Sequence, residues 1–235
     1  MANIYLAPPH SYAAPMRRGL ERLGFKVVTT TPPEAASLVS RSRGLTGLIP
    51  IALLDNLRHC PGPMVYSLGE TMSVVIVSKE PLSLRDCRVI AVSGESRTSI
   101  IYLKLVSTRL GLGARILQHP STSTKDLLGS GECALLLGDE ALRARTRYYI
   151  VEDLGALVKR VLGINPVYAV TATRGRCNKL LEEYKPVPSD TDPIETSKRT
   201  GIPLEDAVKY HNTIKLDYNK EALEKALWIL KNSTV

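Results

Sequence analysis

Hydroxyl side chains and an arginine gather where a helix is expected to begin, in SGESRTSIIYLKLVSTRL (93–110). Apolar residues recur at helical spacing from Ile100 to Leu110, which places the helix start near Ser96. Free N–H groups and the positive end of the helix dipole make such a start an anion-binding site. N-capping beside a surface arginine is the alternative interpretation. The candidate binding residues in this segment are Ser96, Arg97, Thr98 and Ser99.

The loop after the first expected strand, APPHSYAAPM (7–16), supplies a second group: His10, Ser11 and Tyr12. It should lie at the corresponding edge of a second lobe, from which all three side chains can reach a cleft. Histidine titrates near neutrality, so His10 is a candidate base. A lone loop histidine is more often without a catalytic role, and that alternative stays open.

Ser73 lies where the chain enters a long apolar stretch, MSVVIVS (72–78), beside Glu70 and Thr71. No GxSxG elbow and no Ser-His-Asp order accompanies it, so the sequence does not favour an activated nucleophile. We expect the Ser73 hydroxyl to form a hydrogen bond with a ligand. Glu70 and Thr71 are candidate ligand contacts because of their position beside it.

Two aspartates follow apolar stretches and begin expected helices. Asp139 comes after CALLL (133–137), and Asp153 begins the segment DLG (153–155). The carboxyl ends of strands in an open α/β sheet are where ligands bind, so Asp139 is a candidate binding residue. Aspartate is also a preferred N-cap residue, and capping is the interpretation that the pattern favours for both positions.

Strands alternate with helices over most of the chain, which predicts an α/β protein with mostly parallel sheets. Two long strands, 72–78 and 166–172, bracket a block with its own βαβαβ order. We expect them to join two α/β lobes with a ligand cleft between. The expected lobes are residues 1–76 plus 171–235, and residues 77–170; only helices are expected after Ala172. The expected strands span 4–7, 25–29, 47–51, 72–78, 88–92, 115–118, 133–137, 148–152 and 166–172.

The composition is that of a globular protein: 235 residues, 44% hydrophobic and 23% charged. No apolar run reaches the roughly 20 residues of a membrane-spanning helix, and the first residues do not resemble a secretory signal. The expected compartment is the cytoplasm. The net charge is +8, but one Trp, one Phe and no Lys/Arg block argue against nucleic acid. A small anionic ligand is the favoured partner; the oligomeric state is not indicated.

Four cysteines stand at positions 60, 87, 133 and 177 without a CxxC pair or a histidine at metal-ligand spacing. Structural zinc is therefore not expected, and neither is any other metal. Cys87 and Cys133 lie in apolar stretches, where a free thiol behaves as a small hydrophobic side chain. Nothing in the spacing calls for disulfides, and nothing excludes them.

Five segments appear in an order that is typical of one family. They are MSVVIVSKEPL (72–82), SRTS (96–99), ALLLGDEAL (134–142), DLG with GINPVYAV (153–155 and 163–170), and GIPLEDAVKYHNTIKLDY (201–218). Together they resemble the chorismate dehydratase family of the futalosine route to menaquinone, a relative of 1,4-dihydroxy-6-naphthoate synthase. GDEAL matches the dehydratase branch, because the synthase carries a histidine in that region.

The resemblance implies a two-lobed, periplasmic-binding-protein-like fold and a lyase without metal or organic cofactor. The implied reaction removes water from chorismate to give 3-[(1-carboxyvinyl)oxy]benzoate. Ser73 matches the serine that the family uses in catalysis, and Ser96 to Ser99 match its carboxylate-binding helix start. The family's asparagine three residues before Pro15 is Tyr12 here, so His10 or Tyr12 would have to replace it.

A second departure from the family lies at Glu70, which stands where the family has a glycine-proline stretch. A glutamate at this place could act as a replacement base, or it could repel a dicarboxylate. A non-catalytic binding protein for a small anionic carboxylate is therefore the alternative function.

Overall fold

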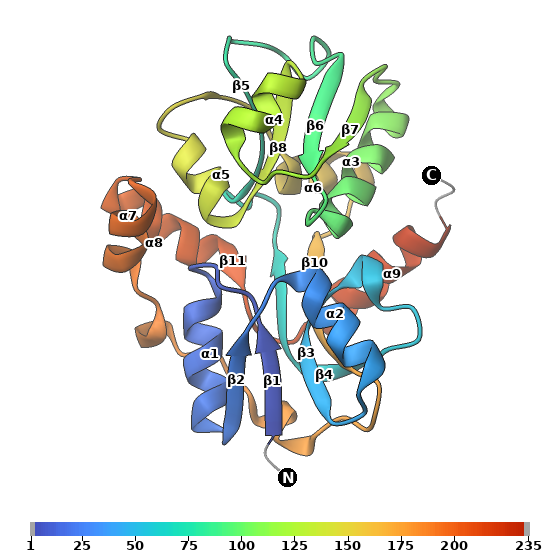
Figure 1. The fold of residues 1–235 in the computed structure, drawn as a ribbon, viewed down its shortest axis with the longest axis vertical. Helices are drawn as coiled ribbons and strands as arrows, with labels where there is room; N and C mark the ends of the chain where they lie inside the picture. The colour runs from blue at the N-terminus through green and yellow to red at the C-terminus, as the bar shows by residue number, and fades with distance from the viewer. Residues whose placement is uncertain (1–2, 233–235) are drawn as a thin grey trace.

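The computed structural model describes residues 3–232, and in it two α/β lobes are stacked along the long axis of the molecule (Figure 1). One lobe is built on a six-stranded sheet and the other on a five-stranded sheet. We call them the six-stranded lobe and the five-stranded lobe. The first and last described elements, β1 and α9, belong to the six-stranded lobe, and the chain passes through the other lobe in between (Figure 1).

The six-stranded sheet has the order β11-β4-β10-β3-β1-β2. Its central part is mixed: β1 runs parallel to β2 and β3, whereas β10 runs antiparallel to β3 and β4. Its strands are β1 (Asn3–Ala7), β2 (Phe25–Thr29), β3 (Leu45–Pro50), β4 (Arg58–Ser67), β10 (Val167–Thr173) and β11 (Ile214–Lys215). Its α-helices are α1 (Ala13–Arg22), α2 (Pro32–Arg41), α7 (Pro193–Thr200), α8 (Leu204–Thr213) and α9 (Lys220–Asn232), with 3-10 turns at Ile51–Leu53, Lys179–Glu183 and Pro188–Asp190.

The five-stranded sheet has the order β7-β6-β8-β5-β9. Here β6 runs parallel to β7 and β8, while β5 runs antiparallel to β8 and β9. Its strands are β5 (Val74–Ser78), β6 (Val89–Ser93), β7 (Arg115–His119), β8 (Cys133–Leu137) and β9 (Tyr149–Asp153). Its helices are α3 (Arg97–Leu110), α4 (Thr124–Ser130), α5 (Gly138–Ala144) and α6 (Leu154–Leu162).

The alternation of strands and helices is confirmed, but the expectation of mostly parallel sheets is wrong. Antiparallel pairing by β4, β5 and β10 makes both sheets mixed. Two strands were not predicted. The sequence RHCPGPMVYS of β4 carries two prolines and a glycine, which normally interrupt strands; irregular pairing with β10 accommodates them. Two-residue β11 is too short for a periodic signal, so the tail after Ala172 is not helical throughout.

The chain crosses between the lobes earlier than the expected boundaries at 76/77 and 170/171. All five residues of β5 pair within the five-stranded sheet, and Val167 at the start of β10 already pairs within the six-stranded sheet. The crossovers therefore lie in residues 68–73 and 163–166, just before the two strands. The exact division of the chain into lobes remains a prediction.

Two disulfides are present, a possibility that the sequence left open. Cys60 pairs with Cys177, and Cys87 pairs with Cys133, with Cα–Cα distances of 5.6 and 5.7 Å. The partners are 117 and 46 residues apart in the chain, so local spacing carried no signal for them. Parallel pairing of β6 with β8 brings the second pair together.

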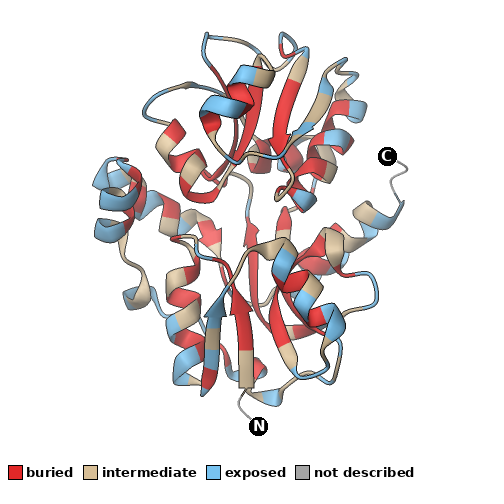
Figure 2. Cartoon of the chain, viewed as in Figure 1, coloured by how far each residue is buried: buried red, intermediate tan, exposed pale blue. Residues whose placement is uncertain are grey.

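Many of the buried residues lie in the two sheets, and Figure 2 shows the central strands as mostly buried. Every residue of β5 is buried, in keeping with a strand that has neighbours on both edges. No helix within residues 3–232 has the length and apolar character needed to cross a membrane.

The first crossover is anchored at the start of α6 by one carboxylate. Asp153 accepts hydrogen bonds from the backbone N–H groups of Thr71 and Met72 at 3.1 and 2.8 Å. It also accepts one from the Ala156 N–H at 3.0 Å, which confirms its expected role as N-cap. Burial raises the pKa of Asp153, and these hydrogen bonds oppose the rise. The crossover and the helix therefore share one anchoring group.

Close approach of the crossover to α6 requires Gly155. A Cβ atom at this position would lie 2.3 Å from the Gly69 carbonyl oxygen and 2.4 Å from Cγ2 of Thr71. Backbone cannot move aside as a flexible side-chain end can. In the DLG segment, Asp153 thus anchors the crossover, and Gly155 leaves room for the crossover backbone.

We predict that Gly155→Ala lowers the free energy of unfolding by about 2 kcal/mol or more, because overpacking displaces the anchored crossover. Urea unfolding followed by circular dichroism measures this. Gly129→Ala is the matched control, since Gly129 is also helical but has open space around its Cβ position; that change should be neutral or stabilising. Equal effects of the two substitutions would contradict the packing argument.

Candidate functional site

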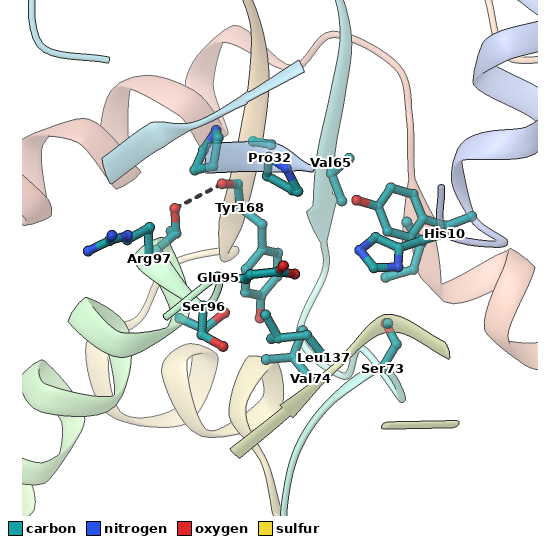
Figure 3. A pocket seen from close by; sticks show the side chains of 17 residues that line it. His10, Pro32, Val65, Ser73, Val74, Glu95, Ser96, Arg97, Leu137 and Tyr168 are labelled. Carbon is teal, nitrogen blue, oxygen red and sulfur yellow. Dashed lines mark hydrogen bonds between the residues drawn. The ribbon is translucent and has the colours of Figure 1, made fainter. Parts of the chain in front are cut away.

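A cavity lies between the two lobes and is lined by residues from both (Figure 3). The six-stranded lobe contributes His10 and Tyr12 from the loop after β1, and Tyr168 from β10. The five-stranded lobe contributes Glu95 from the loop after β6, and residues 96–99 at the start of α3. Ser73, at the end of the first crossover, also lines it. His10 and Tyr12 from one predicted group and Ser96 to Ser99 from the other therefore meet in one cavity.

The predicted helix start near Ser96 is confirmed, and Ser96 is the N-cap of α3. No side chain caps the helix by hydrogen bonding to its first N–H groups. The Ser96 hydroxyl lies 3.1 Å from the Ser93 hydroxyl. The Ser96 side chain therefore does not cap the helix. The start of α3, which is the positive end of its dipole, faces the cavity.

Thr98 links the lobes instead of presenting a free hydroxyl. Its Oγ1 donates to the Tyr168 carbonyl at 3.0 Å, the dashed bond in Figure 3, and accepts from the Ala52 N–H at 3.4 Å. Ser99 is buried and lines the cavity. Arg97 is exposed, and its side chain projects away from the cavity centre in Figure 3. Of the four predicted residues, Ser96 and Ser99 are best placed to contact a ligand.

His10 lies against the backbone of Gly138, where α5 begins. A Cβ at Gly138 would meet the imidazole Nδ1 at 2.8 Å, and the positive φ of 58° also favours glycine there. Burial lowers the pKa of His10, and the nearby Asp139 carboxylate opposes that shift. His10 is therefore uncharged at neutral pH.

Tyr12 lies beside His10, with 5.6 Å between the ring centroids. Burial raises the pKa of its hydroxyl, so Tyr12 stays protonated and can only donate or accept a hydrogen bond at neutral pH.

Asp139 connects the lobes and does not cap α5, contrary to the favoured interpretation of the sequence. The N-cap position is Leu137, with no side-chain capping bond. The buried Asp139 carboxylate accepts from the N–H and the hydroxyl of Ser11, both at 3.1 Å. Its other partner is Nε of Arg199, at 2.8 Å. Ser11 and Asp139 satisfy each other, so the structure assigns both a positioning contact.

Arginines also hold the loop that carries His10. Arg199 donates through Nη2 to the Pro9 carbonyl at 3.2 Å, and Arg17 donates through Nη1 to the Pro8 carbonyl at 2.7 Å. Proline lacks an N–H, but its carbonyl oxygens remain strong acceptors. Arg199 thus joins the loop of one lobe to Asp139 of the other.

Ser73 is buried at the cavity wall, below His10 in the view of Figure 3. Its carbonyl oxygen accepts from the Gly138 N–H at 2.8 Å, so Ser73 and His10 both lie at the start of α5. Glu70 and Thr71 are not among the lining residues. Glu70 pairs with Lys209 at 3.1 Å, and Thr71 donates to Asp153. The structure thus gives these two neighbours of Ser73 other partners.

Among the polar lining residues, Glu95 and Tyr168 were not predicted from the sequence. Glu95 lies within the segment 93–110, but hydroxyls and an arginine make the pattern of an anion site there, and a carboxylate is not part of that pattern. Tyr168 lies on a strand without a motif of its own, and its hydroxyl is buried without a hydrogen-bond partner among residues 3–232. Only the folded arrangement shows that both side chains run toward the middle of the cavity (Figure 3).

A second hollow of about 490 Å³ shares His10 and Glu95 with this cavity. Ion pairs line it: Asp139 with Arg199 at 2.8 Å, and Glu140 with Arg143 at 3.1 Å. Across the described part of the chain, no group of three or more His, Cys, Asp or Glu residues could hold a metal ion.

Comparison with known proteins identifies relatives of both the sequence and the fold. The family described as menaquinone biosynthesis matches residues 8–203. Comparison with curated proteins gives no match. Protein AF1704 from Archaeoglobus fulgidus has a similar structure, with a TM-score of 0.67 at 17% identity over 98% of this chain and 96% of that one.

Periplasmic binding proteins share the fold as well. The aliphatic sulphonate binding protein SsuA from Escherichia coli has a TM-score of 0.61 at 12% identity, covering 97% and 86% of the two chains. A Candida albicans protein described as having the generic periplasmic binding protein fold has a TM-score of 0.60 at 11% identity, covering 98% and 89%. The expected fold class is therefore confirmed.

Asp139→Ala should lower the free energy of unfolding by about 2 kcal/mol, because it leaves the Ser11 groups and Arg199 without their buried partner. Urea unfolding measures the change. As a control, Glu152→Ala removes the more exposed pair with Arg160 and should cost less than about 1 kcal/mol. An Asp139→Ala protein as stable as this control would show that the contact between the lobes contributes little.

Proposed function

Since the chain belongs to the menaquinone biosynthesis family, we propose that it is a chorismate dehydratase-like lyase that forms 3-[(1-carboxyvinyl)oxy]benzoate. One observation carries the proposal: a single cavity between the lobes joins Ser73, the His10–Tyr12 pair and the open start of α3. These are the places where the resemblance to the dehydratases locates the reaction and the carboxylate.

The proposed reaction makes modest demands on a protein site. Loss of water completes an aromatic ring, so the site must orient the substrate, accept a ring proton and assist the departing hydroxide. The N–H groups at the start of α3, with Ser96 and Ser99, would hold a carboxylate. The Ser73 hydroxyl would donate a hydrogen bond to the departing oxygen. No metal or organic cofactor has a part in this proposal.

We place the proposed reaction in the cytoplasm, where a small anionic carboxylate would be the partner and neither nucleic acid nor membrane takes part. The two disulfides limit the kinds of cell in which a cytoplasmic location is consistent with the structure. Structural disulfides persist in oxidising compartments and in the intracellular proteins of hyperthermophiles. A cytoplasmic location thus implies a source whose intracellular proteins keep such bonds.

The alternative is a binding protein that holds a small anionic carboxylate without changing it. Tyr12 at the position of the family's asparagine favours this alternative, because a protonated phenol replaces an amide. The aliphatic sulphonate binding protein shows that the same fold can serve ligand binding alone.

Purified protein incubated with chorismate should give a product lighter by one water, detected by mass spectrometry. Ser73→Ala should lower kcat/KM by about 100-fold, since it removes a donor aimed at the departing group. Thermal stabilisation of the wild type by unchanged chorismate, without product, would contradict the lyase and favour the binding protein.

A further inference from the structure

Helix α8 of the six-stranded lobe lies against the crossover that leads to Ser73. Lys209 of this helix pairs with Glu70 of the crossover at 3.1 Å. The next residue of the helix, Tyr210, is fully buried and belongs to the same core cluster as Met72, which directly precedes Ser73. The end of the crossover and the middle of α8 are therefore packed together.

The hydroxyl of Tyr210 is buried, and among residues 3–232 it makes no hydrogen bond of good geometry. Burial raises the pKa of Tyr210, and the Ser73 side chain opposes that rise as a hydrogen-bonding neighbour. The Asp139 carboxylate also acts on Tyr210, but through its charge, and it is occupied by Ser11 and Arg199. The Ser73 hydroxyl is therefore the group within reach of the buried Tyr210 hydroxyl.

The backbone around Ser73 is held in place by several contacts. Met72 has a φ of 60°, a left-handed conformation that a residue with a side chain rarely adopts. Asp153 accepts from the Met72 N–H at 2.8 Å, and Arg145 donates to the Met72 carbonyl at 3.4 Å. The Gly138 N–H donates to the Ser73 carbonyl at 2.8 Å. Rare backbone conformations persist where the surroundings hold them, and they concentrate at functional sites. These contacts fix the backbone and leave the Ser73 hydroxyl free to rotate.

Each hydroxyl of the Ser73–Tyr210 pair can donate or accept, so two arrangements compete. If Ser73 donated to Tyr210, the Tyr210 hydrogen would be buried without an acceptor, which is unfavourable. If Tyr210 donates to Oγ of Ser73, its own hydrogen is satisfied and the Ser73 hydrogen is free. Ser73 is buried except where it lines the cavity, so that free hydrogen points into the cavity.

We propose that Tyr210 is a positioning residue for the dehydration: its hydroxyl donates to Oγ of Ser73 and turns the Ser73 hydrogen toward the substrate. This inference rests on the proposed function, in which Ser73 donates to the departing oxygen. Tyr210 is not among the residues that line the cavity, so it acts through Ser73 and not on the substrate. Hydrogen bonds of catalytic groups are often poorly aligned until substrate binds, which agrees with the incomplete geometry of the Tyr210 hydroxyl.

A double-mutant cycle in the chorismate assay tests the proposal. Tyr210→Phe removes only a hydroxyl, and it should lower kcat about tenfold and leave KM within about twofold, because Ser73 keeps its donor but loses its orientation. In the Ser73→Ala background the same change should have no further effect on kcat, since the two residues act as one unit. Tyr184→Phe is the matched control and should behave as wild type, because Tyr184 also has a buried hydroxyl without a hydrogen bond in the described chain.

Crystal structures of wild type and Tyr210→Phe give a second readout that does not need turnover. The Ser73 side chain should occupy one rotamer in wild type and more than one in Tyr210→Phe. A wild-type kcat in Tyr210→Phe, or an equal loss of kcat in the wild-type and Ser73→Ala backgrounds, would overturn the positioning role. So would a single, unchanged Ser73 rotamer in Tyr210→Phe. Absence of turnover by wild type, with the Ser73 rotamer lost in Tyr210→Phe, would overturn the dehydratase function and support the contact between Tyr210 and Ser73.

Discussion

The buried carboxylate of Asp139 holds the two halves of the site together. Asp139 lies in the five-stranded lobe, at the start of α5. Its carboxylate accepts hydrogen bonds from the N–H and the hydroxyl of Ser11 in the other lobe. Arg199 closes the arrangement by binding both Asp139 and the Pro9 carbonyl. Because His10 and Tyr12 flank Ser11, this one contact sets where their rings stand relative to Ser73 and Gly138. A site divided between two lobes depends on such a contact for its geometry.

A second carboxylate, Asp153, plays the same part for the chain that crosses between the lobes. It fixes the backbone of Thr71 and Met72 to the start of α6, directly before Ser73. The position of Ser73 at the cavity wall is therefore determined from two sides: by Asp153 through the crossover, and by the Gly138 N–H through its own carbonyl. Both anchoring acids were singled out in the sequence as helix starts, and only Asp153 is also an N-cap.

The sequence predicted the parts of this protein that depend on local pattern. The alternation of apolar strands with helices gave the α/β class, and the hydroxyl-rich segment placed the start of α3 at Ser96. Local patterns carry no information about which distant segments of the chain pair with one another. Antiparallel β10 next to β3, the Cys60–Cys177 bond and the Arg199 contact all join residues more than 50 positions apart.

The proposed function requires chorismate to bind between the lobes with its reacting ring beside Ser73. A crystal structure of Ser73→Ala with chorismate tests this most directly, since the variant should hold the substrate and consume it slowly. We predict one carboxylate of chorismate at the start of α3, beside Ser96 and Ser99, and the ring next to residue 73. Chorismate bound with its ring remote from residue 73, or an empty cavity at saturating chorismate, would contradict the proposed function.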